Sequence, residues 1–133
     1  MLTLRQIELV QSTVRQLSFE RECFVAAFDQ QISKVDPELA QRIDARQRDT
    51  SLELVALLHL LVSALAWPVN ADQFIQLLLK PYLACNLSKD HLVHLKQAWL
   101  RALHECLGAK FSGETEQAWA NALNWAATQY ESF

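Results

Sequence analysis

The stretch of sequence that decides the fold runs from Tyr82 to Gly108 and reads YLACNLSKDHLVHLKQAWLRALHECLG. Apolar residues recur in it every three or four positions, which is the spacing of one face of an α-helix. Ser88 is a residue type favoured at a helix N-cap, and Gly108 is the type that most often follows a helix end. The stretch therefore predicts a helix over residues 89–107, with an apolar face of Leu92, Leu95, Trp99, Ala102, Leu103 and Cys106.

The N-terminal part of the chain carries the same kinds of signal. Thr3 and Gln6 have capping-box spacing at the start of a helix over residues 4–17. Ser18 is then in place to cap a second helix. The apolar side predicted for that second helix consists of Phe19, Cys23, Phe24, Ala27 and Phe28.

A third, short helix is predicted after residue 36. The segment Asp36-Pro37-Glu38 places an N-cap residue, a first-turn proline and a first-turn acid in order, ahead of the apolar Leu39 and Ile43. Residues 44–50 are polar and charged, which favours a solvated corner between helices.

The middle of the chain predicts two more helices. Thr50 and Glu53 form a capping box before a segment that is rich in leucine on nearly every side. A helix that is apolar all round belongs in the middle of a bundle. Asn70 and Gln73 then begin a shorter helix, which Pro81 stops.

A last helix is predicted over about residues 114–129, after the long one. Either Ser112 or Thr115 is in position to cap it. Its predicted inner face is formed by Trp119, Ala122, Leu123, Ala126 and Tyr130.

The composition suits a single all-α domain over residues 1–133. Hydrophobic residues make up 51% of the chain, which is enough for a sizeable core. With only 2 Gly and 3 Pro, the chain lacks the turn residues of a β protein, and a glycine-rich phosphate loop is excluded. Seven or eight helices are predicted in all.

Charge and hydropathy patterns exclude several classes of partner. A net charge of −3 does not favour nucleic acid. The longest apolar run, over residues 54–67, is interrupted by His59 and Ser63 and is too short to span a membrane. No signal-peptide pattern is evident, and 3 cysteines without paired spacing favour a reducing compartment. We therefore expect a cytoplasmic protein that binds neither nucleic acid nor a membrane.

Short motifs in a consistent order cover almost the whole chain. They are Ile7-Glu8-Leu9-Val10 with Thr13-Val14, Phe28, Asp36-Pro37-Glu38-Leu39, His91-Leu92, Leu107-Gly108 and Ala118-Trp119. In these motifs the chain resembles single-domain bacterial hemoglobins and the globin half of flavohemoglobins. The resemblance implies a globin-like fold, in which the helices enclose a flat heme pocket.

The pocket positions implied by this resemblance differ from the family's usual residues. Tyr82 stands where the iron-ligating histidine is expected. Asp29 stands in place of Tyr, Ile43 in place of the heme-stacking Phe, and Glu53 in place of the distal Gln or His. Leu57 keeps the family's aliphatic distal residue. With the phenylalanine that sets the register, the matched pocket positions are Phe28, Asp29, Ile43, Glu53, Leu57 and Tyr82.

Each substitution also has an interpretation that needs no heme. Glu53 fits a capping-box acid, Ile43 fits a core residue, and Asp29 can face either solvent or the interior. Tyr82 follows a proline and fits a packing residue. A phenol, with a reference pKa of about 10, ligates iron when a cation stabilises its phenolate, and Lys80 is the only cation near it in sequence.

None of the 4 histidines is an evident replacement ligand. His59 lies two residues after Leu57, about 200° around a helix, so it faces away from the surface that Leu57 lines. His91 and His94 are one turn apart and hold a metal only with further ligands, so we interpret them as surface residues. His104 lies near a helix end, where the dipole favours a cation.

The interpretation we draw is a globin-like domain with a degenerate heme site. It is expected to carry no cofactor, to have no catalytic residues, and to act as a sensing or protein-interaction module. The alternative is a bacterial globin that binds heme b through Tyr82 and binds or detoxifies O₂ or NO. The resemblance also implies a homodimer through the last two helices. Trp125 lies six residues after Trp119, roughly 240° around the helix, so it should not share the inward direction of Trp119. We therefore expect Trp125 to contribute to the dimer, and the alternative is a lone surface aromatic residue.

Overall fold

In the computed structural model of the chain, the described residues are 2–17, 19–42, 54–66, 73–74, 76 and 87–131. Every regular element within them is helical, which confirms the all-α class. Residues 37–42 are helical as well. The named elements are α1 (Leu4–Leu17), α2 (Arg21–Val35), α4 (Leu54–Ala66), α6 (Lys89–Leu107), the 3₁₀ turn η2 (Gly108–Lys110) and α7 (Gly113–Glu131).

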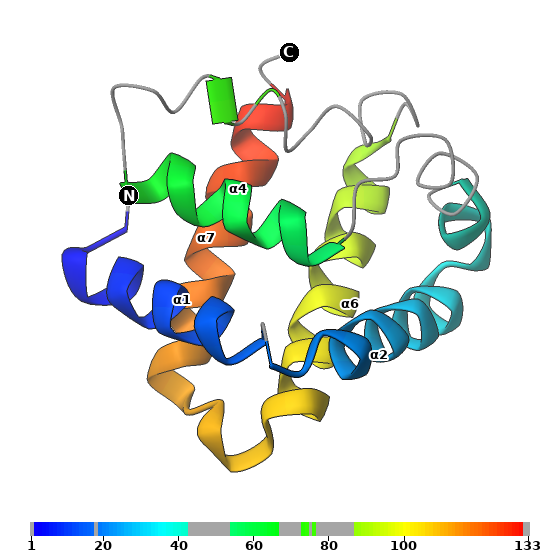
Figure 1. Cartoon of the computed structure of the whole chain (residues 1–133). Helices are drawn as coiled ribbons and strands as arrows, with labels where there is room; N and C mark the ends of the chain where they lie inside the picture. The colour runs from blue at the N-terminus through cyan, green and yellow to red at the C-terminus, as the bar shows by residue number, and fades with distance from the viewer. Residues whose placement is uncertain are drawn as a thin grey trace.

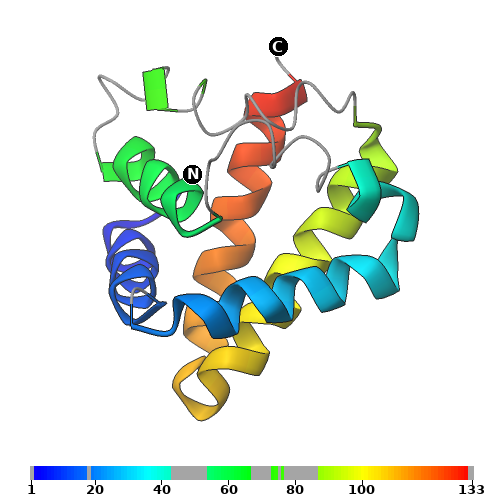
Figure 2. The same ribbon diagram turned by 45° about the vertical axis from the view of Figure 1, so that its right-hand side comes forward.

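α6 and α7 form one packed pair, and the other named helices lie across it, as Figures 1 and 2 show from two sides. α6 and α7 are joined through η2 and pack against each other. α2 packs across α6, while α1 packs against both α7 and α4. None of the described helices is long and apolar enough to cross a membrane.

The long helix α6 has the bounds that its caps predict. The Ser88 side chain accepts a hydrogen bond from the backbone N–H of His91 at 3.2 Å, as an N-cap should. At the other end Gly108 adopts a φ of 55°, a left-handed conformation that favours glycine. Its N–H donates to the carbonyl of His104, which satisfies one of the last carbonyls of the helix.

α1 and α7 also begin at predicted caps. Thr3 and Gln6 exchange the two hydrogen bonds of a capping box, each of 3.1 Å. Of the two candidates for the last helix, Ser112 is the cap, because its Oγ accepts from the Thr115 N–H at 3.2 Å.

The start of α2 differs from the prediction, which placed Phe19 on the helix's apolar side. The N–H groups of Phe19 and Glu20 bond back to the carbonyls of Gln16 and Leu17, so these residues extend the last turn of α1 instead. α2 begins only at Arg21, and Phe19 is left 91% exposed. The predicted cap Ser18 lies outside the described residues.

The core lies between α6–α7 and the helices that cross them. Trp99 of α6 meets the rings of Phe24 and Phe28 of α2 edge-on, with centroid separations of 5.9 and 5.7 Å. Trp119 of α7 is fully buried. Tyr130 is only half-buried, and its hydroxyl accepts a 2.8 Å hydrogen bond from the Leu87 N–H just before α6.

Candidate functional site

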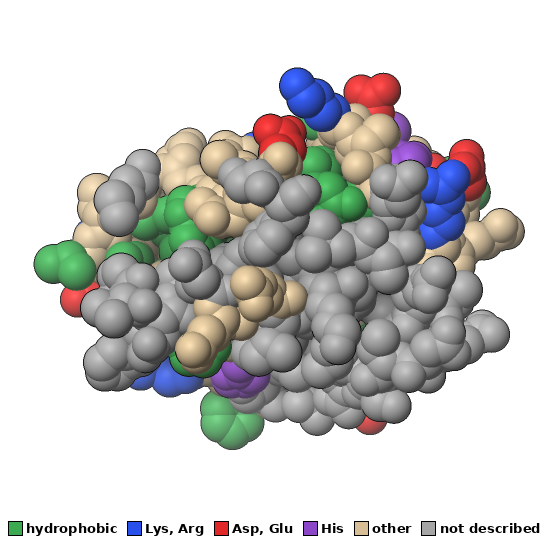
Figure 3. Space-filling model, turned by 90° about the horizontal axis from the view of Figure 1, so that it is seen from above, with side chains coloured by type: hydrophobic (Ala, Val, Ile, Leu, Met, Phe, Trp, Pro, Cys, Tyr) green, Lys and Arg blue, Asp and Glu red, His purple; other side chains and the backbone are tan. Residues whose placement is uncertain are grey.

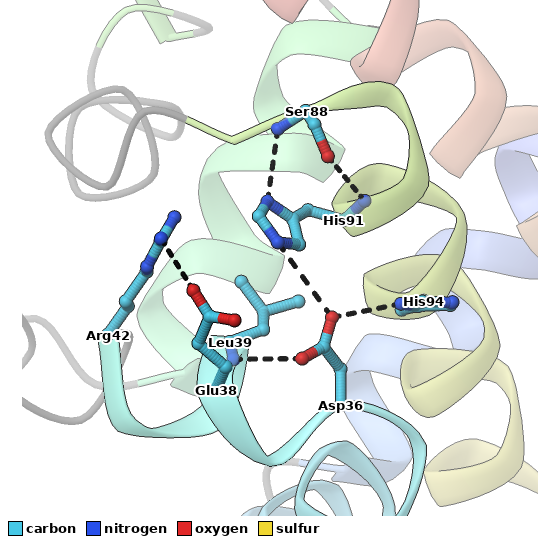
Figure 4. Close-up of polar contacts among 7 residues, drawn as sticks. All are labelled: Asp36, Glu38, Leu39, Arg42, Ser88, His91 and His94. Atoms are coloured by element: carbon cyan, nitrogen blue, oxygen red, sulfur yellow. Dashed lines mark hydrogen bonds and ion pairs between the residues drawn. The ribbon is translucent and has the colours of Figure 1, made fainter.

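A polar cluster joins the end of α2 to the start of α6, and Figure 4 shows it in close-up. We call it the Asp36 cluster; its members are Asp36, Ser88, His91 and His94. His94 Nδ1 lies 3.0 Å from Asp36 Oδ2, and His91 Nε2 lies 3.9 Å from the same oxygen. Asp36 Oδ1 accepts from the Leu39 N–H at 3.1 Å, which confirms the predicted N-cap.

His91 is both a cap and a neighbour of the carboxylate. Its Nδ1 accepts a 3.1 Å hydrogen bond from the Ser88 N–H, completing a reciprocal capping box with the Ser88 side chain. An accepting Nδ1 carries no proton, so the proton of a neutral ring sits on Nε2, which faces Asp36. Protonation of both ring nitrogens would break the Ser88 bond and open one end of the capping box.

Asp36 is held in its charged form. The hydrogen bond with His94 lowers the pKa of Asp36 below its usual value, and the bond from the Leu39 backbone lowers it further. Its side chain is only 15% exposed, and this burial raises the pKa, but by less than the hydrogen bonds lower it. Because an ionised carboxylate only accepts, the Nδ1 of His94 must be the donor.

The residue types of a catalytic triad meet here, but their geometry is that of a helix cap. A triad needs the serine hydroxyl hydrogen-bonded to the imidazole. Ser88 Oγ accepts from the backbone of His91, while the His91 ring accepts from the backbone of Ser88. The imidazole is thus directed at a backbone N–H, and the hydroxyl has no base to activate it within the cluster.

The same cluster does not have the ligand arrangement of a metal site. Within the described ranges, no group of three or more His, Cys, Asp or Glu side chains has the geometry to hold a metal ion. The bond from Ser88 occupies Nδ1 of His91, and the Nδ1 of His94 donates to Asp36.

The prediction that His91 and His94 are plain surface residues needs correction. Both rings are partly buried against Asp36, with 19% and 36% side-chain exposure.

The six positions matched to a heme pocket are only partly described. Phe28 is buried and belongs to the aromatic core. Asp29 is exposed, which confirms the solvent-facing alternative. Leu57 lies in α4, and nothing is described of its side chain. The predictions for the remaining positions fall outside the described residues: Ile43, Glu53 and Tyr82.

All 4 histidines of the chain lie in the described part. His59 of α4 and His104 of α6 are exposed. His104 packs beside Phe111, with a centroid separation of 5.9 Å. In Figure 3 histidine side chains reach the upper face in separate places, one of them among acidic and basic side chains. The other two histidines belong to the Asp36 cluster.

Comparison of the chain with protein-family models, with curated proteins and with solved structures found no match.

Proposed function

We propose that this chain is a globin-like domain without heme, and that it works by sensing or by protein interaction rather than by catalysis. The observation that carries the proposal is the placement of the histidines. Two are exposed and two contact Asp36, so none of them points into a site enclosed by the residues that the structure describes. An axial imidazole, the commonest way in which globins hold iron, is therefore not at hand.

The packing around Phe28 supports the same proposal. The resemblance would place this residue at the edge of a heme pocket. Its ring instead contacts Trp99 edge-on and lies 6.5 Å from the ring of Phe24. Side chains fill the space between α2 and α6 there, and a close-packed interior leaves no slot for a flat macrocycle between these helices.

The polar side chains support a non-catalytic role. The Asp36 cluster is occupied with capping α6 and residues 37–42. Its serine is not paired with a base, and its histidines are engaged with backbone or carboxylate groups. A general acid or base must be free to exchange its proton with a substrate. A ring nitrogen that is already hydrogen-bonded to the backbone or to Asp36 is less free to do so.

The decisive test is reconstitution with heme. We expect protein purified from cells supplied with a heme precursor to show no stoichiometric Soret band, because all four histidines are either exposed or in contact with Asp36. Excess hemin added to the purified protein should likewise give no saturable Soret shift. A bacterial hemoglobin with a proximal histidine, expressed in parallel, is the positive control for both measurements.

A stoichiometric Soret band with an assigned axial ligand would overturn the heme-free proposal in favour of the heme-binding alternative. Tyr82 is then the first ligand to examine, because it occupies the proximal position of the resemblance. Loss of the phenolate-to-iron charge-transfer band in Tyr82→Phe would assign it, and an unchanged spectrum would exclude it.

The homodimer through α6 and α7 remains a prediction, and Trp125 is its test residue. Trp125 is partly exposed on α7 and packs only partly against the core. Aromatic side chains in such positions are enriched at interfaces. We expect sedimentation to show a dimer that Trp125→Ala weakens at least tenfold in Kd, while Leu4→Ala, which changes an exposed residue of α1, leaves it unchanged. A monomer at high concentration would refute the prediction.

A further inference from the structure

Two cysteines far apart in the sequence meet where α2 begins and α6 ends. Cys23 lies in the first turn of α2, and Cys106 lies in the last turn of α6. Their sulfur atoms are 2.7 Å apart. A disulfide bond is about 2.0 Å long, so less than about 1 Å of movement would bring these atoms to bonding distance.

The two thiols differ in access to solvent. Cys23 is exposed, whereas Cys106 is partly buried. Burial, and then the hydrogen bond with Cys23, raises the pKa of Cys106 to about 12, so that thiol stays protonated at neutral pH. A soluble oxidant therefore reaches Cys23 first, and Cys106 is positioned as the second thiol.

We propose that Cys23 and Cys106 are a reversible disulfide site, closed by a hydroperoxide and reopened by a thiol reductant. The Cys23 thiolate attacks one peroxide oxygen, the O–O bond breaks, and the products are a sulfenic acid and hydroxide. The Cys106 sulfur then attacks the Cys23 sulfur, the S–O bond breaks, and water leaves with the Cys106 proton. In sum, two thiols and one hydrogen peroxide give one disulfide and two waters.

The bond would lock a contact that the fold already makes. α2 and α6 meet at their other ends through Asp36 and His94, and between them through the aromatic rings. No helix has to move for the bond to form. Its main effect is on the unfolded chain, which becomes a closed loop spanning positions 23 to 106 and loses conformational entropy. The proposal is independent of whether heme is bound.

The test uses the full chain with Cys85→Ser, so that only Cys23 and Cys106 can react. We expect brief exposure to hydrogen peroxide to remove both free thiols, to leave the chain monomer-sized on a non-reducing gel, and to link the two peptides in a non-reducing digest. The oxidised protein should unfold roughly 10 °C higher than the reduced one. Dithiothreitol should reverse all of these changes.

Two single variants are the controls. Cys23→Ser changes an exposed side chain, so the variant should fold and its unfolding temperature should not respond to peroxide. Cys106→Ser should let a sulfenic acid accumulate on Cys23, which a dimedone-type reagent detects. The proposal is wrong if the protein with both cysteines keeps its thiols, cross-links between chains, or goes on to a sulfinic acid at Cys23 without the internal bond.

Discussion

Replacement of Trp99 by alanine should lower the free energy of unfolding by about 3–5 kcal/mol, which is the usual range for a buried aromatic residue. Trp99 is 4% exposed and contacts Phe24 and Phe28 edge-on. It therefore holds α2 against α6 at the centre of their contact. Domains of this size have about 5–15 kcal/mol in total, so this single change should remove a large share of the stability. Urea titration followed by far-UV circular dichroism measures the loss.

Two further variants test whether the loss comes from the buried position and from the aromatic ring of Trp99. Val93→Ala, on the same helix but 54% exposed, should change the stability by no more than about 0.5 kcal/mol. Trp99→Phe should lose less than half as much as Trp99→Ala, because the indole Nε1 has no hydrogen-bond partner in the described chain to leave behind. An equal loss in Trp99→Phe and Trp99→Ala would mean that the edge-on ring contacts contribute nothing.

The contact with Phe28 can be measured directly. A double-mutant cycle with Phe28→Leu and Trp99→Leu should give a coupling energy of about 0.5–1.5 kcal/mol, as expected for edge-on aromatic pairs. These leucine variants fill more of the space than alanine does, so they remain folded enough to be measured.

The helix bounds were predictable because helix caps are local. Ser88, Gly108 and the Thr3–Gln6 box each act within four residues, and the structure places α1 and α6 at the predicted bounds. The second helix shows the limit of such signals. Ser18 looks like a cap in the sequence, but the backbone bonds that extend α1 moved the start of α2 to Arg21.

The candidate sites were not predictable because their members are distant in the chain. Asp36 and His94 are 58 residues apart, and Cys23 and Cys106 are 83 apart. No short-range spacing signals either contact; only the packing of α2 on α6 creates them. A local hint did exist for His91, because it occupies the position three residues after Ser88 where a capping box usually has Glu or Gln.

Removal of the Asp36 side chain should have the second-largest effect, and this effect should depend on pH. At pH 7, Asp36→Ala loses the cap to the Leu39 N–H and the charged hydrogen bond with His94. Together these changes should lower the free energy of unfolding by about 2–3 kcal/mol. Glu38→Gln is the control, because Glu38 is exposed and its ion pair with Arg42 spans one helical turn, a contact worth about 0.3–0.5 kcal/mol.

The sign of the pH dependence follows from the lowered pKa of Asp36. A carboxyl that is more acidic in the folded state than in the unfolded chain stabilises the fold above its unfolded pKa, about 3.9. That stabilisation disappears as the pH falls through the lower folded value. The difference between the wild-type protein and Asp36→Ala should therefore shrink as the pH falls below about pH 4.

Asp36→Asn divides the loss into its two parts. The amide oxygen can still accept from the Leu39 N–H, but the side chain has no charge to attract His94 or His91. We expect this variant to keep the cap and to lose only the pH-dependent part. Because neither variant has an ionisable side chain at position 36, its stability should run parallel to that of Asp36→Ala at every pH. Urea denaturation at a series of pH values measures all three proteins. An Asp36→Asn protein as stable as the wild type at pH 7 would show that the contacts with His94 and His91 contribute nothing to the fold.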